Sequence, residues 1–153
     1  MKKIILFVLL LMAGAGAFAQ MTVVGMEEKD AVKSLKEQFK DSNLKNGEKF
    51  KLEGMDAYIQ EMTSDDVDIY LVMSEGLCLG CIDKIAYDES LYTALKDMMD
   101  EDRKKVDSQT WVKNDPDLDM DIYFKLFTNQ DETLIYLIIS PLDLVDVLYS
   151  LTQ

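Results

Sequence analysis

Apolar positions recur along the chain with two different periods, and each period predicts one kind of secondary structure. Residues 26–46 place apolar side chains such as Leu35 and Phe39 on one face of a helix, with charged residues between them. Residues 56–62 and 67–73 instead alternate between apolar and polar side chains, with a polar turn between the two stretches. The pattern therefore predicts a helix followed by a β-hairpin.

The last third of the chain has the clearest pattern. Apolar residues alternate with polar or aromatic residues from Leu118 to Phe127, which predicts a strand with one buried face. Residues 133–139 are apolar on both sides, so we expect a central strand there. Ser140 and Pro141 predict the start of a terminal helix, because serine caps free amides and proline needs no donor at the first helical position.

The segment between the two predicted hairpins divides into a loop and a helix. Residues 75–87 have no regular period and predict an irregular loop. Residues 89–105 predict a second helix, with Asp88 or Ser90 as its cap. The element order is then α-β-β-α-β-β-α. We expect one α+β domain, with an antiparallel sheet of about four to five strands and helices packed mainly on one face.

The first nineteen residues have the parts of a bacterial secretory signal peptide. Two lysines precede an apolar run, and small residues end it at Ala19, so that cleavage leaves Gln20 as the new N-terminus. The strongly apolar run is shorter than the roughly 20 residues of a transmembrane anchor. We therefore expect residues 1–19 to be removed and residues 20–153 to form one exported domain, periplasmic or extracellular, with no membrane-spanning segment.

Composition removes several classes of function. The formal charge of the chain is −13, and loss of the two leader lysines makes it −15. Nucleic acids and anionic lipids are bound through clustered Lys and Arg, so we expect neither as a partner. The chain has no histidine, which excludes Ser–His–Asp and Cys–His catalysis and histidine-ligated metals.

Three segments of the C-terminal half resemble a family of small exported proteins of unknown function found in Bacteroidota. They are a charged amphipathic helix, a long hairpin with an acidic turn, and a terminal helix that opens on Leu-Asp-Leu: LYTALKDMMDEDRKK, MDIYFKLFTNQDETLIYLIIS and PLDLVDVLYSL. The resemblance implies a small exported α+β domain, and it implies no activity, substrate or site. The N-terminal half and the cysteine pair are not part of it.

Cys78 and Cys81 form a C-x-x-C motif within the expected loop. In an oxidising compartment such a pair predicts a disulfide, which is our leading interpretation. The order of strand, C-x-x-C, helix, hairpin and helix is also that of thioredoxin-like folds, in which a helix N-terminus lowers the pKa of the first thiol. A thiol–disulfide oxidoreductase is therefore the alternative, although Cys81 lies well before the expected helix. Two reduced or metal-binding thiols are the third interpretation.

Asp115, Asp117, Asp119 and Asp121 recur with a spacing of two, as at the opening of a calcium-binding loop. The pattern then fails, because the sixth position is Met120 rather than glycine, and the twelfth position is not glutamate. We therefore expect solvent-facing acids, which also protect a sheet edge from aggregation. Calcium binding is kept as the alternative.

Four aromatic residues fall on the face opposite the predicted apolar face of the sheet: Tyr70, Tyr123, Phe127 and Tyr136. Aromatic residues on a solvated sheet face are typical of a contact surface. Either they bind a partner, or the N-terminal helix or the loop 75–87 covers them. Our functional hypothesis is a non-enzymatic exported domain without a cofactor. It binds an unidentified protein or envelope component, or a second copy of itself, through this face.

Overall fold

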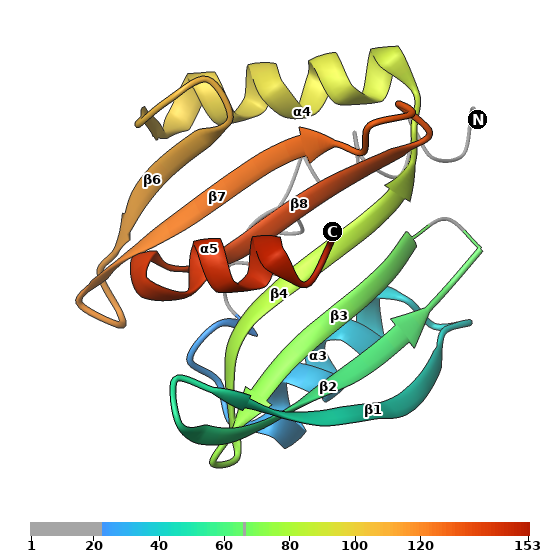
Figure 1. Ribbon diagram of the computed structural model, residues 1–153, viewed down its shortest axis with the longest axis vertical. Helices are drawn as coiled ribbons and strands as arrows, with labels where there is room; N and C mark the ends of the chain where they lie inside the picture. The colour runs from blue at the N-terminus through green and yellow to red at the C-terminus, as the bar shows by residue number, and fades with distance from the viewer. Residues whose placement is uncertain (1–22, 66) are drawn as a thin grey trace.

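A continuous antiparallel sheet runs through the residues that the computed structural model describes, 23–65 and 67–153 (Figure 1). Within these residues the sheet has eight strands in the order β1-β2-β3-β4-β8-β7-β6-β5, and three helices accompany it. The helices are α3 (Glu28–Gln38), α4 (Glu89–Asp102) and α5 (Leu142–Ser150). The strands are β1 (Asn43–Leu52), β2 (Met55–Thr63), β3 (Val67–Ser74), β4 (Leu77–Ala86), β5 (Lys104–Lys105), β6 (Thr110–Asp115), β7 (Met120–Thr128) and β8 (Leu134–Pro141). The predicted signal peptide and its cleavage site lie outside the described residues.

The chain runs through one topology twice. Helix α3 precedes the strands β1 to β4, and helix α4 precedes the strands β5 to β8. The last strands of the two units, β4 and β8, pair antiparallel, with Ile82 opposite Ile138, so the units meet around an approximate two-fold axis. The tripeptide Asp-Ile-Tyr begins at the second position of both β3 and β7. Tyr70 and Tyr123 are therefore equivalent residues of the two units.

Each face of the sheet has its own apolar cluster. On one face, Leu35 of α3 and Leu95 of α4 pack onto the sheet. On the opposite face, Leu144 and Leu148 of α5 pack with Ile82 and other buried residues. Figure 1 shows α5 in front of the sheet and α3 behind β2 and β3. Helix α5 contacts mainly β7 and β8, and its buried residues join those of the neighbouring strands in one cluster.

The α+β class and the antiparallel sheet are confirmed. The predicted hairpin is β2 and β3, and the predicted central strand is β8, which lies between β4 and β7. The predicted cap of the second helix is also present, because Oδ1 of Asp88 accepts a hydrogen bond of 2.9 Å from the backbone N–H of Leu91. These elements carry the strongest periodic patterns in the sequence.

The predicted number of strands is too low. The first helix ends at Gln38 rather than at Asn46, and the chain then forms β1. This edge strand is mostly exposed, and only Phe50 and Leu52 at its end alternate with charged residues, so the pattern indicates a period of two there and not along the whole strand. The predicted loop 75–87 is largely β4, and the two short strands β5 and β6 were not expected. The described element order is α-β-β-β-β-α-β-β-β-β-α.

The terminal helix differs from expectation at its start and in its position. It begins after Pro141, which occupies the N-cap position without a side-chain cap. The hydroxyl of Ser140 instead donates a hydrogen bond of 3.1 Å to the carbonyl oxygen of Pro141. Because α5 packs on the face opposite α3 and α4, the described helices cover both faces of the sheet.

Candidate functional site

The C-x-x-C motif lies in a buried strand rather than in a loop. Cys78 and Cys81 both belong to β4, beside the central pairing with β8, and both are buried. Neither cysteine is in a disulfide bond, so the predicted disulfide is wrong. No helix begins close behind the motif, because β4 continues to Ala86. The helix dipole on which the redox alternative depends is therefore not near these thiols.

A β-bulge sets the orientation of the motif. Val72 pairs with Gly80 and Met73 pairs with Cys78, so Leu79 is the extra residue of β4. Residues three apart point to opposite faces of a regular strand. The bulge brings both cysteines to the face that α3 and α4 cover, whereas Leu79 packs on the α5 face.

Gly80 is a point of close approach between α5 and the sheet. A Cβ atom at this position would lie 2.9 Å from Cδ1 of Leu148 and 3.1 Å from both the carbonyl oxygen of Ile139 and the Cβ of Ser140. Leu148 is fully buried, so it has little room to move away. The glycine of the motif therefore allows the terminal helix to dock.

Burial makes both thiols poor nucleophiles. It raises the pKa of Cys78 to about 12. Burial also raises the pKa of Cys81 well above its usual range, and the carboxylate of Asp83, with Oδ1 3.8 Å from Sγ, raises it further. Thiol–disulfide chemistry needs a thiolate, so this environment does not favour the redox alternative.

The four aspartates do not surround a common point. Asp115 is buried, and its Oδ1 accepts a hydrogen bond of 2.9 Å from the backbone N–H of Asp117 at the β6–β7 turn. Asp119 lies in that turn with a φ of 51°, and Asp121 is exposed near the start of β7. Among the described residues no group of three or more His, Cys, Asp or Glu side chains has an arrangement that could hold a metal ion. The calcium alternative gains no support from this geometry.

Three of the four predicted face aromatics come together beside α5. The Phe127 ring stacks on the Tyr136 ring with centroids 5.3 Å apart, and the Tyr149 ring of α5 meets Phe127 edge-on at 4.8 Å. Tyr70 packs against the same apolar cluster. Tyr123 lies on this face four residues before Phe127 in β7 and is not part of the group. We call Tyr70, Phe127, Tyr136 and Tyr149 the aromatic cluster.

Neither the N-terminal helix nor the segment 75–87, the two elements that the sequence suggested, covers the aromatic cluster. Helix α3 lies on the other face, and residues 77–86 are a strand of the sheet itself. It is α5 that packs here, and it leaves Phe127 only 3% exposed. Tyr70, Tyr136 and Tyr149 stay half-buried. Phe127 thus supports the cluster from below, and the three tyrosines form its accessible part.

Charged side chains border the aromatic cluster. The Nζ atom of Lys125 lies 4.9 Å from the ring centroid of Tyr149. Burial and, to a smaller extent, the nearby carboxylates of Glu61 and Asp68 together raise the pKa of Tyr70 to about 12. The Tyr70 hydroxyl therefore keeps its proton at physiological pH, and its hydrogen-bond partner within the chain is the side chain of Glu61.

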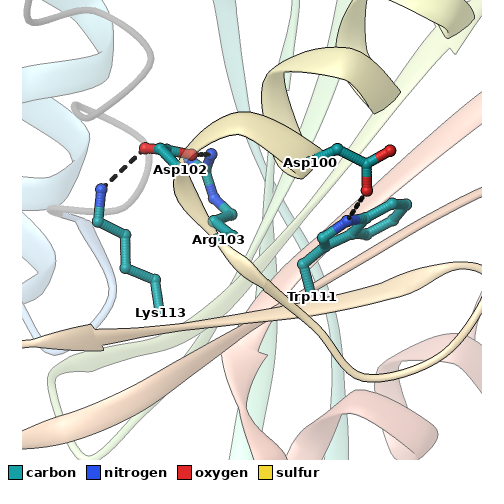
Figure 2. A network of polar contacts seen from close by, with 5 residues as sticks. All are labelled: Asp100, Asp102, Arg103, Trp111 and Lys113. Atoms are coloured by element: carbon teal, nitrogen blue, oxygen red, sulfur yellow. Dashed lines mark hydrogen bonds and ion pairs between the residues drawn. The ribbon is translucent and has the colours of Figure 1, made fainter.

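A polar network that sequence reasoning did not single out fixes the end of α4 to the sheet (Figure 2). Trp111, the single tryptophan of the chain, is buried, and its Nε1 donates a hydrogen bond of 2.8 Å to Oδ1 of Asp100. Asp102 forms ion pairs with Arg103 and with Lys113, the latter at 2.9 Å. The only signal in the sequence was that one arginine and one tryptophan stand close together.

Arg103 is the most deeply buried cation of this network. Its side chain is only 2% exposed, and its guanidinium carbon lies 4.3 Å from the centroid of the Phe124 ring. Burial lowers the pKa of Arg103, and Asp102 opposes that shift. Arg103 is buried and paired with Asp102, so the network holds α4 in place rather than offering a binding site.

Two further findings concern membrane-spanning helices and similarity to known proteins. Within the described residues, no helix has both the length and the apolar character needed to cross a membrane. A comparison of the chain with protein-family models, with curated proteins and with solved structures gives no match.

Proposed function

We propose that this chain is an exported, non-enzymatic binding domain that holds a protein or envelope component against its aromatic cluster. The observation that carries the proposal is the group of three half-buried tyrosines around the buried Phe127. Tyrosine is enriched among residues that dominate binding energy, because its rigid ring gives contact area and its hydroxyl gives a hydrogen bond.

The charge of the domain supports a binding role in an aqueous compartment. A strongly negative net charge, −15 once the two leader lysines are removed, keeps the domain dispersed in water and attracts cationic groups over long range. Lys125 and the carboxylates of Glu61 and Asp68 border the cluster. A polar border around an aromatic centre is the usual composition of a transient protein interface.

The test compares a pair of tyrosines in the aromatic cluster with a single tyrosine that lies on the same face outside the cluster. The double variant Tyr70→Ser with Tyr136→Ser removes accessible rings of the cluster, and Tyr123→Ser is the matched control outside it. Each protein is immobilised and exposed to an envelope extract with chemical cross-linking, and its self-association is measured by sedimentation velocity.

We expect the affinity of the double variant for its partner, or for a second copy of itself, to be at least about tenfold weaker than that of the control. Its melting temperature should fall by only a few degrees, because both tyrosines are half-buried. Equal retention of the partner by the double variant and by wild type would contradict the proposal. Phe127 is not suitable for this test, since it is buried.

A further inference from the structure

A shallow depression lies over β5, β6 and β7, away from the aromatic cluster. Its volume is about 560 Å³, and its lining includes Lys104, Val106, Val112, Asn114, Asp121 and Tyr123. Trp111 and Phe124, the neighbours of Val112 and Tyr123 in their strands, belong to the cluster on the α3 and α4 face. Since side chains alternate along a strand, Val112 and Tyr123 point to the α5 face.

The short strand β5 accounts for the open space at the depression. In the first unit, β1 pairs with β2 from Asn43 to Leu52. In the second unit, the equivalent strand β5 pairs with β6 only through Lys104 and Lys105. The rest of β6 therefore has no outer strand beside it, and the space next to Asn114 is open.

The wall of the depression is held by backbone hydrogen bonds. The N–H of Val106 donates to the carbonyl oxygen of Thr110 at 2.8 Å, and the N–H of Gln109 donates to Oδ1 of Asp107 at 2.8 Å. These bonds close the β5–β6 turn and hold Val106, a residue of the lining, in place.

The polar groups of the depression include donors and acceptors in fixed positions. Nδ2 of Asn114 donates a hydrogen bond of 3.2 Å to Oδ1 of Asp121, which holds the amide and the carboxylate side by side. The second amide hydrogen and Oδ2 of the carboxylate remain for a ligand. Lys104 is exposed and adds a further donor. Lys105 also belongs to the lining, and its Nζ lies 5.4 Å from the centroid of the Trp111 ring.

We propose that this depression binds a neutral saccharide. The hydroxyl groups of a sugar both donate and accept hydrogen bonds, so they match the adjacent amide and carboxylate of Asn114 and Asp121. The C–H groups on one face of a sugar ring pack against an aromatic ring and an aliphatic side chain, which Tyr123 and Val112 supply. Lys104 and Asp121 carry opposite charges, so the depression has no charge of a single sign that would select an anion or a cation, and a neutral polyol fits it.

This site is separate from the aromatic cluster and does not depend on the proposed function. The repeat offers a matched control, because Tyr70 is the equivalent of Tyr123 in the first unit. Tyr70 belongs to the aromatic cluster, whereas Tyr123 lines the depression. One substitution in each unit therefore distinguishes loss of the saccharide from loss of a protein partner.

The experiment titrates the purified protein with maltotetraose, cellotetraose and chitotetraose, and follows backbone amide shifts by NMR and heat by calorimetry. We expect at least one of these tetrasaccharides to bind with a millimolar or tighter Kd, and to shift the amides of Val112, Asn114 and Tyr123. Tyr123→Ala should weaken binding at least about tenfold. Tyr123→Phe should keep most of the affinity, and Tyr70→Ala should leave it unchanged.

Two exposed positions keep the test valid if Tyr123→Ala does not fold. Asn114→Ala and Lys104→Ala remove polar groups from exposed sites, and each should weaken binding several-fold with little change in melting temperature. Absence of binding by all three tetrasaccharides at millimolar concentration would overturn the proposal. An equal loss in Tyr70→Ala would also overturn it, as would tighter binding of a sulfated tetrasaccharide than of the neutral probes.

Discussion

Replacement of Gly80 by valine tests how α5 is docked on the sheet. A Cβ atom added at this position would lie only 2.9 Å from Cδ1 of Leu148 and 3.1 Å from the Ile139 carbonyl oxygen. Valine adds two methyl groups beyond that Cβ. Either α5 moves outward, or β4 and β8 shift in the middle of the sheet.

The cost of this substitution follows from the close packing around Gly80. Overpacking a well-packed core costs about 1–3 kcal/mol, and two extra methyl groups in a site without space place the cost near the upper end. Removing a glycine from a strand returns about 0.5–1 kcal/mol of backbone entropy, which leaves a net loss of about 2 kcal/mol. An unfolding entropy of about 2.1 cal/mol/K per residue, summed over the described chain, is about 0.28 kcal/mol/K, so the melting temperature should fall by about 7 °C.

The assay is thermal unfolding followed by circular dichroism, with three comparison proteins. Ala86→Val also introduces valine into β4, but at an exposed position. It should change the free energy of unfolding by less than about 0.5 kcal/mol. Leu148→Ala removes the atom nearest to the new side chain. Leu148→Ala alone should cost about 2–5 kcal/mol, and the double variant should cost less than the sum of the two single changes.

Proteolysis reports whether α5 has left the sheet. Asp143 and Asp146 lie in α5, so a protease that cleaves at aspartate should cut Gly80→Val faster than wild type. Wild-type melting of Gly80→Val, or an equal loss of stability in Ala86→Val, would refute the reasoning that Gly80 seats the helix.

Three further predictions concern the core and the buried charges. Phe127→Ala should lower the free energy of unfolding in urea by about 3–5 kcal/mol, because Phe127 is buried between Tyr136 and Tyr149, and a loss below about 1 kcal/mol would show that the ring is not core. Burial raises the pKa of Cys78 from 9.0, the value of an exposed thiol, to about 12 in the folded protein. The stability that the buried, protonated thiols contribute is therefore complete below pH 9 and is lost as the pH rises toward 12. The melting temperature should therefore fall across that range, and less steeply in the variant Cys78→Ala with Cys81→Ala; identical slopes would contradict the assignment. Arg103→Met should preserve or raise stability, whereas Asp102→Asn, which leaves the buried guanidinium without its anion, should lower it; the opposite order in urea unfolding would show that the ion pair is a net source of stability.

The sequence was sufficient where one face of an element is buried and the other is not. The strands β3, β7 and β8 were recognised because their side chains alternate or are apolar throughout. The strand β1 is an edge with both faces largely exposed, so it carries such an alternation only at its end, at Phe50 and Leu52. In β4 the extra residue Leu79 interrupts the period of two, and Gly80 contributes no side chain, which is why an inner strand resembled a loop.

The candidate site was predictable only in part. The period of two placed Tyr70, Phe127 and Tyr136 on one face of the sheet, and the structure brings these three residues together. The burial of Phe127 and the participation of Tyr149 depend on where α5 packs. An amphipathic helix records which of its faces is buried, but not which face of a sheet it covers. The depression at Tyr123 depends on the short length of β5, which the sequence pattern did not indicate.

The pairing of β4 with β8 has a consequence for the order in which the protein folds. Each unit is a meander of neighbouring strands and can form from local contacts, whereas the pairing of Cys81 with Ile139 closes a loop that contains most of the second unit. Contacts of such long sequence separation form late. Until β8 arrives, β4 is an apolar strand with an unpaired edge, which is a template for pairing with another chain. The approximate two-fold axis makes β4 of a second copy a suitable wrong partner. The net charge of −13 makes two copies of the chain repel each other during folding, while β8 does not yet cover the edge of β4.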